Sequence, residues 1–278
     1  MPVALILSSF VSASRVGGAA QQYVLAAHKI DPVLAPTVMF GRSPALGGQG
    51  EVTSPEVFRR MLADIEADAI FGLVDLVITG HFSSPEQVEI AAAMLERIQA
   101  ASGPAPIVIV DPILGDAPKG LYVSVGVARA VADRLVPLAD WITPNLWELG
   151  RLAGADLADA PAAAVVSAAR TLGKPALVTS APAHADEIGL LFVEAAAATL
   201  FAHPRLPRAP SGTGDLVTAS FGAGLVEGLA PAAAAERAAR AAFEVVQAAQ
   251  QGRFAELPIV ALGQRLVRPT APLRIERL

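Results

Sequence analysis

The pattern that most restricts the fold of this chain is a repeated unit of a short apolar run, a loop of small residues and a segment with helical periodicity. The unit begins at Val3–Leu7, at Asp75–Thr79 and at Asp140–Thr143. Strands that are joined through helices are parallel, because the chain must cross back over the sheet before the next strand begins. The pattern therefore predicts an α/β fold with a mostly parallel sheet, whose ligand-binding loops follow the carboxyl ends of the strands.

Other apolar runs define the middle and one side of this sheet. Pro106–Val110 is rich in β-branched residues, which is typical of a central parallel strand buried on both faces. Ile188–Val193 and Thr199–His203 follow each other without a helix between them, so we predict an antiparallel pair at the far side. Because no linker-like stretch divides the chain, we predict a single domain over residues 1–278.

Composition excludes several classes of protein. Hydrophobic residues make up 53% of the chain and charged residues 17%, which is enough for a large core. The net charge of −5, without a basic stripe, argues against nucleic acid or a membrane surface as a partner. The lack of cysteine excludes disulfides, cysteine-bound metals and thiol nucleophiles. Because no run resembles a signal peptide or a membrane span, we expect a cytoplasmic protein.

The strongest candidate site lies in residues 209–228, APSGTGDLVTASFGAGLVEG. Gly212 and Gly214 allow a turn whose N–H groups converge on an anion, and the helix that follows adds further N–H groups and a positive dipole end. Asp215 at that helix start is suited to accept a proton from an attacking hydroxyl. A helix-capping role for Asp215 is an equally good interpretation of this motif alone. The helix itself is apolar on nearly every side.

Two further strands are predicted to end in oxygen-bearing residues. Asp111 directly follows the Pro106–Val110 run, where a carboxylate can hold a cation or a phosphate-bound metal, although an Asx turn before a proline fits as well. Thr179 and Ser180 end the predicted strand that begins at Ala176, and their hydroxyls suit phosphate oxygens. The carboxyl edge of the sheet is therefore the expected place for an anionic ligand.

The segment TPNLWELGRL begins another helix, in which we expect Thr143 to be the N-cap and Pro144 the first helical residue. Asn145 and Glu148 are three residues apart and share one face of the first turn. Their oxygens would suit Mg²⁺ held largely through water. The alternative is that Glu148 only stabilises the helix N-terminus.

Polar and glycine-rich loops are expected near the first two strands. Ser8, Ser9 and Ser12 follow the first predicted strand, where they can meet a ligand or serve as capping and solvent-facing hydroxyls. Residues 40–50 form a glycine-rich segment without periodicity, which is typical of a loop that is mobile or that folds over something. The glycines at 17 and 18 do not form GxGxxG, so a nicotinamide-dependent oxidoreductase is the weakest alternative.

The motifs DPILGD (111–116), TPNLWEL (143–149) and SGTGD (211–215), in this order, resemble those of the pyridoxal kinases of the ribokinase-like superfamily. The resemblance covers nearly the whole chain. It implies a three-layer αβα sandwich with a mostly parallel central sheet, and transfer of the ATP γ-phosphoryl group to the hydroxymethyl group of a pyridine. It also implies Mg²⁺ and a homodimer, and it leaves open whether K⁺ is required.

The resemblance also implies roles for individual residues. Asp215 matches the catalytic aspartate, and the anion hole matches Gly212, Thr213 and Gly214. Contacts to ATP and its phosphates fall on Asp111, Asn145, Glu148, Thr179 and Ser180. Of these, Asp111 and Glu148 are expected near the metal, through water. Contacts to the acceptor substrate fall on Ser9, Thr37 and His81.

The expected acceptor pocket departs from the family pattern. His81 stands where vitamin B6 kinases usually carry a tyrosine, Phe10 and Ser43 where histidines are common, and Gly18 where asparagine is usual. Since a pocket built to hydrogen-bond one substrate rejects analogues that cannot complete those bonds, the acceptor is open. The alternatives are a kinase of hydroxymethylpyrimidine or another small alcohol, and a protein that binds vitamin B6 or a nucleotide without turnover.

Overall fold

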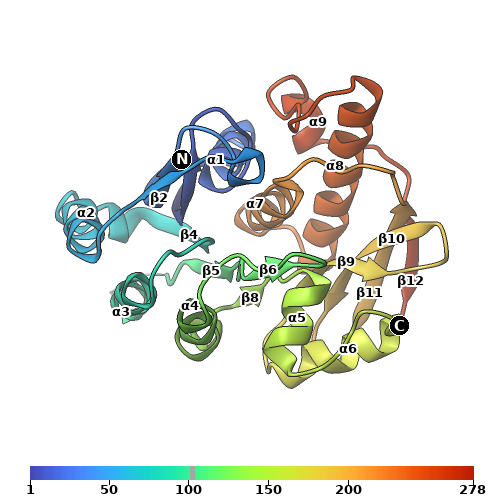
Figure 1. The fold of residues 1–278 in the computed structure, drawn as a ribbon, viewed down its shortest axis with the longest axis horizontal. Helices are drawn as coiled ribbons and strands as arrows, with labels where there is room; N and C mark the ends of the chain where they lie inside the picture. Colours follow the sequence, from blue (N-terminus) through green and yellow to red (C-terminus); the bar gives the residue numbers. More distant parts are fainter. Residues whose placement is uncertain (101–103) are drawn as a thin grey trace.

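A ten-stranded mixed sheet forms the centre of the computed structural model, which describes residues 1–100 and 104–278 (Figure 1). Its order is β12-β11-β10-β9-β8-β5-β4-β1-β2-β3. Six neighbouring strands are parallel: β2 (Asp31–Phe40), β1 (Val3–Val11), β4 (Val74–Thr79), β5 (Ile107–Val110), β8 (Trp141–Ile142) and β9 (Ala176–Pro182). Antiparallel strands extend both edges: β10 (Glu187–Val193), β11 (Ala198–Pro204) and β12 (Arg274–Arg277) on one side and β3 (Gly50–Val52) on the other. The predicted parallel sheet and antiparallel pair are confirmed.

Helices cover both faces of this sheet and make three layers (Figure 1). One face packs against α2 (Pro55–Ala67), α3 (Pro85–Ala100), α4 (Val125–Ala130), α5 (Leu146–Ala153) and α6 (Ala162–Thr171). The other face packs against α1 (Gly18–Ala27), α7 (Thr213–Val226), α8 (Pro231–Gln251) and α9 (Gly263–Val267). The expected αβα sandwich is therefore confirmed. Among the helices of the described residues, none is long and apolar enough to cross a membrane.

Alternation along β1 shows how the sequence builds two cores. Leu5 and Leu7 join the core beneath α2 and α3, whereas Ala4 and Ile6 join the core beneath α1 and α7. Successive side chains of a strand point to opposite faces, so a run that is apolar at every position is buried on both sides. The sheet is thus fixed between its two helical layers.

The helix α7 is buried on all sides, as its apolar sequence predicts. Two of its glycines permit close packing. A Cβ atom on Gly222 would lie 2.9 Å from a methyl carbon of Leu76, and one on Gly224 would lie 2.7 Å from Cβ of Ala234 in α8. Larger residues at these positions would push α7 away from the sheet or from α8, so the glycines set the position of the SGTGD motif.

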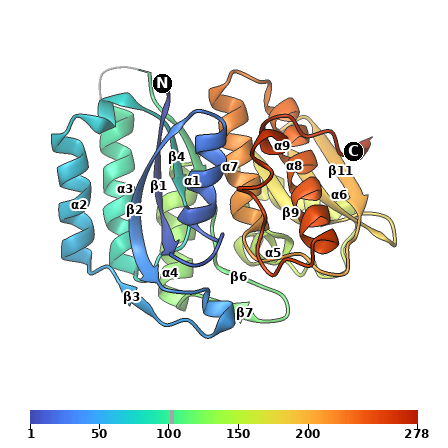
Figure 2. The same cartoon turned by 90° about the horizontal axis from the view of Figure 1, so that it is seen from above.

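Three local predictions differ from the structure. β1 continues to Val11, which pairs with Phe40, so Ser8 and Ser9 are strand residues and not loop residues. The N-cap of α5 is Asn145 and not Thr143. The strand β9 continues to Pro182, so Thr179 and Ser180 lie within it and do not end it. The edge strand β3 begins at Gly50, the last residue of the glycine-rich segment, and a short hairpin of β6 (Gly115–Asp116) and β7 (Gly120–Leu121) follows β5. Both lie at the end of the molecule that is opposite the N-terminus (Figure 2).

Candidate functional site

A cavity of about 330 Å³ lies where β5 and β8 end and α7 begins, beside Thr179 and Ser180 in the middle of β9. It is lined by every residue predicted for the phosphate side of the site: Asp111, Asn145, Glu148, Thr179, Ser180, Gly212, Thr213, Gly214 and Asp215. These residues are far apart in sequence and meet because parallel strands end at one edge of the sheet. The geometry provides a polar, partly closed chamber at that edge.

The turn that enters α7 depends on Gly212. This residue is the N-cap of the helix with φ of 95°, and a Cβ atom on it would lie 2.2 Å from the carbonyl oxygen of Arg15. Only glycine meets both constraints. The first N–H groups of a helix have no intrahelical partner, so Thr213 and Gly214 present backbone donors to the cavity. The Thr213 hydroxyl itself donates to the Pro210 carbonyl (3.0 Å) and stabilises the turn.

The two carboxylate oxygens of Asp215 have different surroundings. Oδ2 accepts a hydrogen bond of 2.8 Å from the backbone N–H of Gly17, whereas Oδ1 is buried without a hydrogen-bond partner among the described residues. Burial raises the pKa of Asp215 to about 6, and the Gly17 bond opposes this rise. Because the N-cap is Gly212, the interpretation of Asp215 as the helix cap is wrong. One oxygen is held and the other is free, which suits a general base.

Asp111 lies at the end of a chain of hydroxyls beneath the cavity. Thr218, one turn after Asp215 in α7, donates to Oδ2 of Asp111 (3.0 Å), and its own oxygen lies 2.8 Å from the hydroxyl of Thr143. Thr143 therefore donates to Thr218 and does not cap α5. Burial, followed by the charges of Glu148 and Asp215, raises the pKa of Asp111 well above its usual range. The cavity thus concentrates negative charge, and a bound cation would relieve it.

Glu148 and Asn145 join α5 to the loop after β5. Their side chains form a reciprocal capping box, and Oε1 of Glu148 also accepts the backbone N–H groups of Leu114 (2.7 Å) and Gly115 (3.3 Å). The Asn145 amide donates to the Gly115 carbonyl (2.8 Å). Burial raises the pKa of Glu148 to about 7 against these bonds. Since backbone donors already occupy its oxygens, any metal contact by Glu148 would run through water.

A metal at this site would have few direct protein ligands. Within residues 1–100 and 104–278, no three histidine, aspartate or glutamate side chains come together in a group that could hold an ion. Four carboxylates line the cavity, those of Asp111, Asp116, Glu148 and Asp215. The oxygens of Asp111 and Glu148, which are expected near a metal, have the hard character that suits Mg²⁺. Such an ion would keep most of its coordination for water and ligand oxygens.

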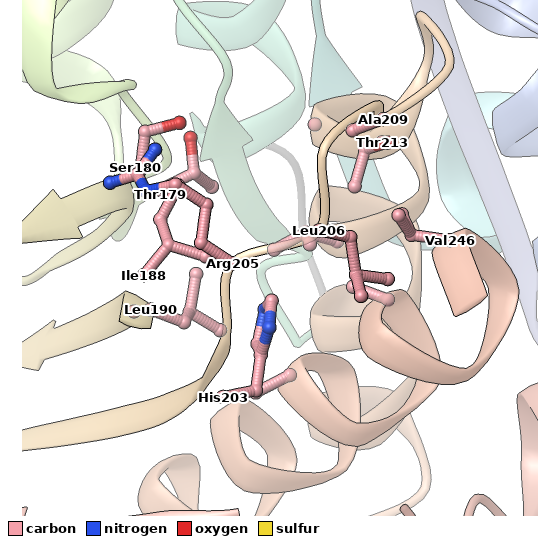
Figure 3. A pocket seen from close by; sticks show the side chains of 15 residues that line it. Thr179, Ser180, Ile188, Leu190, His203, Arg205, Leu206, Ala209, Thr213 and Val246 are labelled. Atoms are coloured by element: carbon pink, nitrogen blue, oxygen red, sulfur yellow. The ribbon is translucent and has the colours of Figure 1, made fainter. Parts of the chain in front are cut away.

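A second, more apolar cavity of about 240 Å³ adjoins the first and shares Thr179, Ser180, Ala209, Thr213 and Gly214 with it (Figure 3). Its walls come from β10, β11 and α8, and include Ile188, Leu190, Ala242 and Val246. His203 lines it and stacks on Phe243, with ring centroids 4.4 Å apart. An apolar chamber beside an anion-binding turn suits a nucleobase.

Thr179 and Ser180 stand at the border of both cavities. The backbone N–H of Thr179 donates to the Pro144 carbonyl (3.0 Å), and Ser180 has φ of 56°, which is rare for a residue with a side chain. Ile113, in the loop after β5, also has a positive φ of 41° and lines the first cavity. Strained backbone of this kind is often found at functional sites.

Three residues that line or contact the site were not predicted from the sequence: Arg205, Gly17 and Thr218. Arg205 lines the second cavity, and Figure 3 shows its side chain extending toward Thr179 and Ser180. Within the described ranges its guanidinium has no acidic partner, so it is available to an anionic ligand. Its position between β11 and SGTGD was a usable signal, because that loop had to cross the carboxyl edge of the sheet.

The residues predicted for the acceptor side lie apart from the polar cavity. The Thr37 hydroxyl donates to the His81 carbonyl (2.6 Å), and the His81 N–H approaches the Ser8 hydroxyl at 3.4 Å. These bonds join β1, β2 and the loop after β4. Burial lowers the pKa of His81 to about 4, so its imidazole is neutral at pH 7. The roles of Thr37 and His81 toward an acceptor stay predictions.

Ser9 lies beneath the start of α1. A Cβ atom on Gly17 would be 2.3 Å from the Ser9 hydroxyl oxygen, and Gly17 has φ of 58°. Ser9 is therefore next to the residue that holds Asp215. Its predicted contact with an acceptor stays a prediction.

Comparison with known proteins places this geometry in a family. Residues 49–256 match the family model of phosphomethylpyrimidine kinase. The chain is 33% identical to a pyridoxine/pyridoxal/pyridoxamine kinase of Bordetella avium over 259 residues, which cover 90% of this chain and 86% of that protein. It is 27% identical to a pyridoxal kinase of Leifsonia xyli over 99% of both chains.

A similar fold occurs in a solved structure. Pyridoxal kinase of Leishmania donovani, in complex with ADP and pyridoxamine, superposes with a TM-score of 0.90 over the full length of both chains at 22% sequence identity. The resemblance inferred from the motifs agrees with all of these comparisons. The chain is a kinase that belongs to the phosphomethylpyrimidine kinase family and, within it, to the pyridoxal kinases of the ribokinase-like superfamily.

Proposed function

We propose that this kinase transfers the γ-phosphoryl group of ATP to the hydroxymethyl group of pyridoxal, pyridoxine or pyridoxamine. The observation that carries the proposal is Asp215, which stands at an anion-binding helix start with one oxygen held by Gly17 and the other free. A buried carboxylate with a pKa near 6 can accept the proton of an attacking hydroxyl at neutral pH. The names of the curated relatives support the choice of acceptor.

ATP fits the two adjoining cavities. The base would occupy the apolar cavity beside His203 and the phosphates the polar one, since the Thr179–Ser180 corner and the Thr213–Gly214 turn border both. Arg205 and the N–H groups at the start of α7 would bind phosphate oxygens. ADP in the Leishmania donovani neighbour supports nucleotide use.

The chain's own residues can then be given roles in the transfer. Oδ1 of Asp215 takes the proton from the acceptor hydroxyl as its oxygen attacks the γ-phosphorus, and the bond from that phosphorus to the β–γ bridging oxygen breaks. The N–H groups of Thr213 and Gly214 stabilise the negative charge that develops on the transferred group. Gly17 keeps Asp215 oriented through Oδ2.

Mg²⁺ fits the residues present. Asp111 and Glu148 supply hard oxygens in a cavity that raises the pKa of both, so a divalent cation would offset the repulsion between them. Asp111 and Glu148 would hold the ion mostly through water, and it would supply neutralisation of the phosphate charge. Asn145 keeps Glu148 in place through the capping box.

We also propose that the protein is cytoplasmic and forms a homodimer. The edge strand β3 exposes its outer backbone edge, and the neighbouring side chains of Met39 and Val52 are about half exposed (47% and 49%). An unpaired edge with exposed apolar residues is a typical site for association of two copies. Sedimentation of the wild type against Val52→Lys tests this proposal, because the charged residue should favour the monomer.

A second acceptor, hydroxymethylpyrimidine, is favoured by the name of the matching family model and by the altered acceptor side. His81, Phe10, Ser43 and Gly18 replace residues that are usual in vitamin B6 kinases. The B6 vitamers and hydroxymethylpyrimidine differ in their ring nitrogens and substituents. The ratio of their kcat/KM values therefore shows which of them the enzyme prefers.

The decisive experiment measures ATP-dependent phosphorylation of the three B6 vitamers and hydroxymethylpyrimidine with Mg²⁺. Wild type is compared with Asp215→Asn and with Asp159→Asn, an exposed control. We expect vitamer product from wild type and from the control, and a loss of about 10²–10⁴-fold in Asp215→Asn. Product from the pyrimidine alone would favour the second acceptor. Saturable binding of ATP without any product would contradict both proposals.

A further inference from the structure

The loop between β1 and α1, residues 12–17, is held by a side chain from near the end of the chain. Oε2 of Glu256 accepts a hydrogen bond of 2.7 Å from the Ser14 hydroxyl and one of 3.1 Å from the backbone N–H of Arg15. Hydrogen bonds to an ionised carboxylate are stronger than those between neutral groups. Glu256 therefore fixes the loop at two adjacent residues.

Glu256 stands on a rigid support. It lies between α8 and α9, and its neighbours Leu257 and Ile259 are almost completely buried (2% and 1% exposed) in the core that also contains α7. Burial of these neighbours fixes the backbone at residue 256, so little backbone freedom is lost when the side chain forms its hydrogen bonds. The carboxylate therefore ties the loop to the core through its two hydrogen bonds.

The same loop contacts the candidate catalytic residues at its other end. The N–H of Gly17 donates to Oδ2 of Asp215, and the carbonyl oxygen of Arg15 packs so closely against Gly212 that a Cβ atom there would be 2.2 Å away. Arg15 is further fixed because its guanidinium lies 4.7 Å from the ring centroid of Tyr23. Two contacts with the SGTGD motif therefore lie within three residues of the Glu256 bonds.

We propose that Glu256 is a positioning residue for phosphoryl transfer: it holds the 12–17 loop so that the Gly17 N–H keeps Asp215 oriented toward the acceptor hydroxyl. This inference rests on the proposed function for its kinetic consequence, but the hydrogen bonds from Ser14 and Arg15 to Glu256 are independent of that function. Glu256 touches neither cavity, so its effect must pass through the loop.

The test compares Glu256→Ala, which removes the carboxylate that accepts both hydrogen bonds, with Glu256→Gln, whose amide oxygen can still accept both. Ser14→Ala removes only one bond, and Glu236→Ala removes a glutamate of α8 that pairs with Arg240 as a control. Each variant is measured for kcat, for KM of ATP and vitamer, and for exchange of the Gly17 amide hydrogen by NMR with ¹⁵N-glycine. Melting temperatures identify any variant that fails to fold.

We expect Glu256→Ala to lower kcat about tenfold, because it removes both hydrogen bonds to the loop and only part of their free energy acts on the orientation of Asp215. KM for ATP should stay within about twofold, and Gly17 exchange should be about tenfold faster. Glu236→Ala should behave like wild type. Ser14→Ala should be intermediate, and Glu256→Gln should lie closer to wild type than Glu256→Ala does, because it keeps both bonds but loses their charge.

Unchanged Gly17 exchange in Glu256→Ala, or a loss of kcat in Glu256→Gln equal to that in Glu256→Ala, would overturn the inference. If Glu256→Ala does not fold, Ser14→Ala provides the same comparison at reduced amplitude. If the wild type phosphorylates none of the acceptors, the proposed function fails. The exchange measurement still decides whether Glu256 holds the 12–17 loop.

Discussion

The backbone N–H of Gly17 donates a hydrogen bond of 2.8 Å to Oδ2 of Asp215, across 198 positions of the sequence. This bond makes the two oxygens of the carboxylate unequal, because Oδ1 remains buried without a partner in the described part of the chain. A base that is held through one oxygen can rotate little, and Asp215 lines the cavity at the start of α7. The same contact therefore orients Asp215 and opposes the rise in its pKa that burial causes.

The first prediction concerns the pH dependence of turnover. Burial raises the pKa of Asp215 to about 6, and the deprotonated form is the active base. As pH falls below 6, kcat/KM for the vitamer should fall tenfold per unit, and it should level off above about 7. The ionisation of ATP and of the vitamer, measured separately in the same buffers, serves as the correction. An acidic limb centred near pH 4 would contradict the assignment.

The second prediction concerns stability. The pKa of Asp215 is higher in the folded state than its ordinary value of 3.8, so the folded protein binds a proton more tightly than the unfolded chain. The associated stability is fully present below pH 3.8 and is lost as pH rises through about 6. Asp215→Asn cannot ionise. The difference between its melting temperature and that of wild type should therefore increase in its favour by a few degrees as pH rises from 5 to 8. A constant difference across this range would show that burial does not penalise the charge.

The sequence predicts the parts of the site that follow from strand ends. Asp111 and Thr179 come directly after apolar runs, so a parallel sheet brings them together at one edge. In SGTGD the glycines themselves indicate a turn that can bind an anion. The bond from Gly17 to Asp215 has no local signal, because it depends on where the β1–α1 loop meets α7.

Two local errors have identifiable causes. Thr143 is a good N-cap residue by type, but Asn145 with Glu148 three residues later forms a complete capping box, and the Thr143 hydroxyl bonds to Thr218 instead. Ser9 looked like a loop residue because serine is common in turns, yet pairing of β1 with β2 continues to Val11. In the first case a stronger local motif fixed the N-cap, and in the second the pairing between two strands outweighed a local preference.

The third prediction concerns Thr218, which donates to Asp111 and accepts from Thr143. Thr218→Val keeps the shape but removes the hydroxyl, and loss of this bond should raise the pKa of Asp111 further. The Mg²⁺ concentration for half-maximal activity should then rise about tenfold, because a hydrogen bond to a charged group contributes on the order of 1.5–3 kcal/mol. Ser220→Ala, another buried hydroxyl of α7 without a partner among the described residues, is the control and should leave the Mg²⁺ response unchanged.

The fourth prediction separates folding from binding within the glycine turn. A Cβ atom on Gly214 would have no heavy atom of the described residues within 4 Å beyond its own chain neighbours and helix turn, so Gly214→Ala should fold and gain up to about 1 kcal/mol of helix stability. Its methyl group would line the phosphate cavity and should raise KM for ATP. Gly212→Ala should instead lower the melting temperature, because φ is 95° and the new Cβ atom would lie 2.2 Å from the Arg15 carbonyl oxygen. Equal effects of the two substitutions on melting temperature would contradict this interpretation of the turn.

The fifth prediction assigns Arg205 to the phosphates of ATP and not to the base. The guanidinium extends toward Thr179 and Ser180 (Figure 3), whereas the apolar wall near His203 is suited to the base. Arg205→Ala should raise KM for ATP about tenfold, the scale of an exposed charge-assisted contact. Arg208→Ala, an exposed arginine in the same loop that lines neither cavity, should have no effect.

Adenosine separates the two possible contacts of Arg205, because it carries the base without phosphates. Its inhibition constant should be the same in wild type and Arg205→Ala if the arginine meets only phosphate oxygens. A parallel loss of adenosine and ATP binding would place Arg205 against the base or the ribose. The loop that carries Arg205 leads directly into SGTGD. If Arg205 contacts only phosphate, both ends of residues 205–215 bind the phosphates of the same ATP molecule.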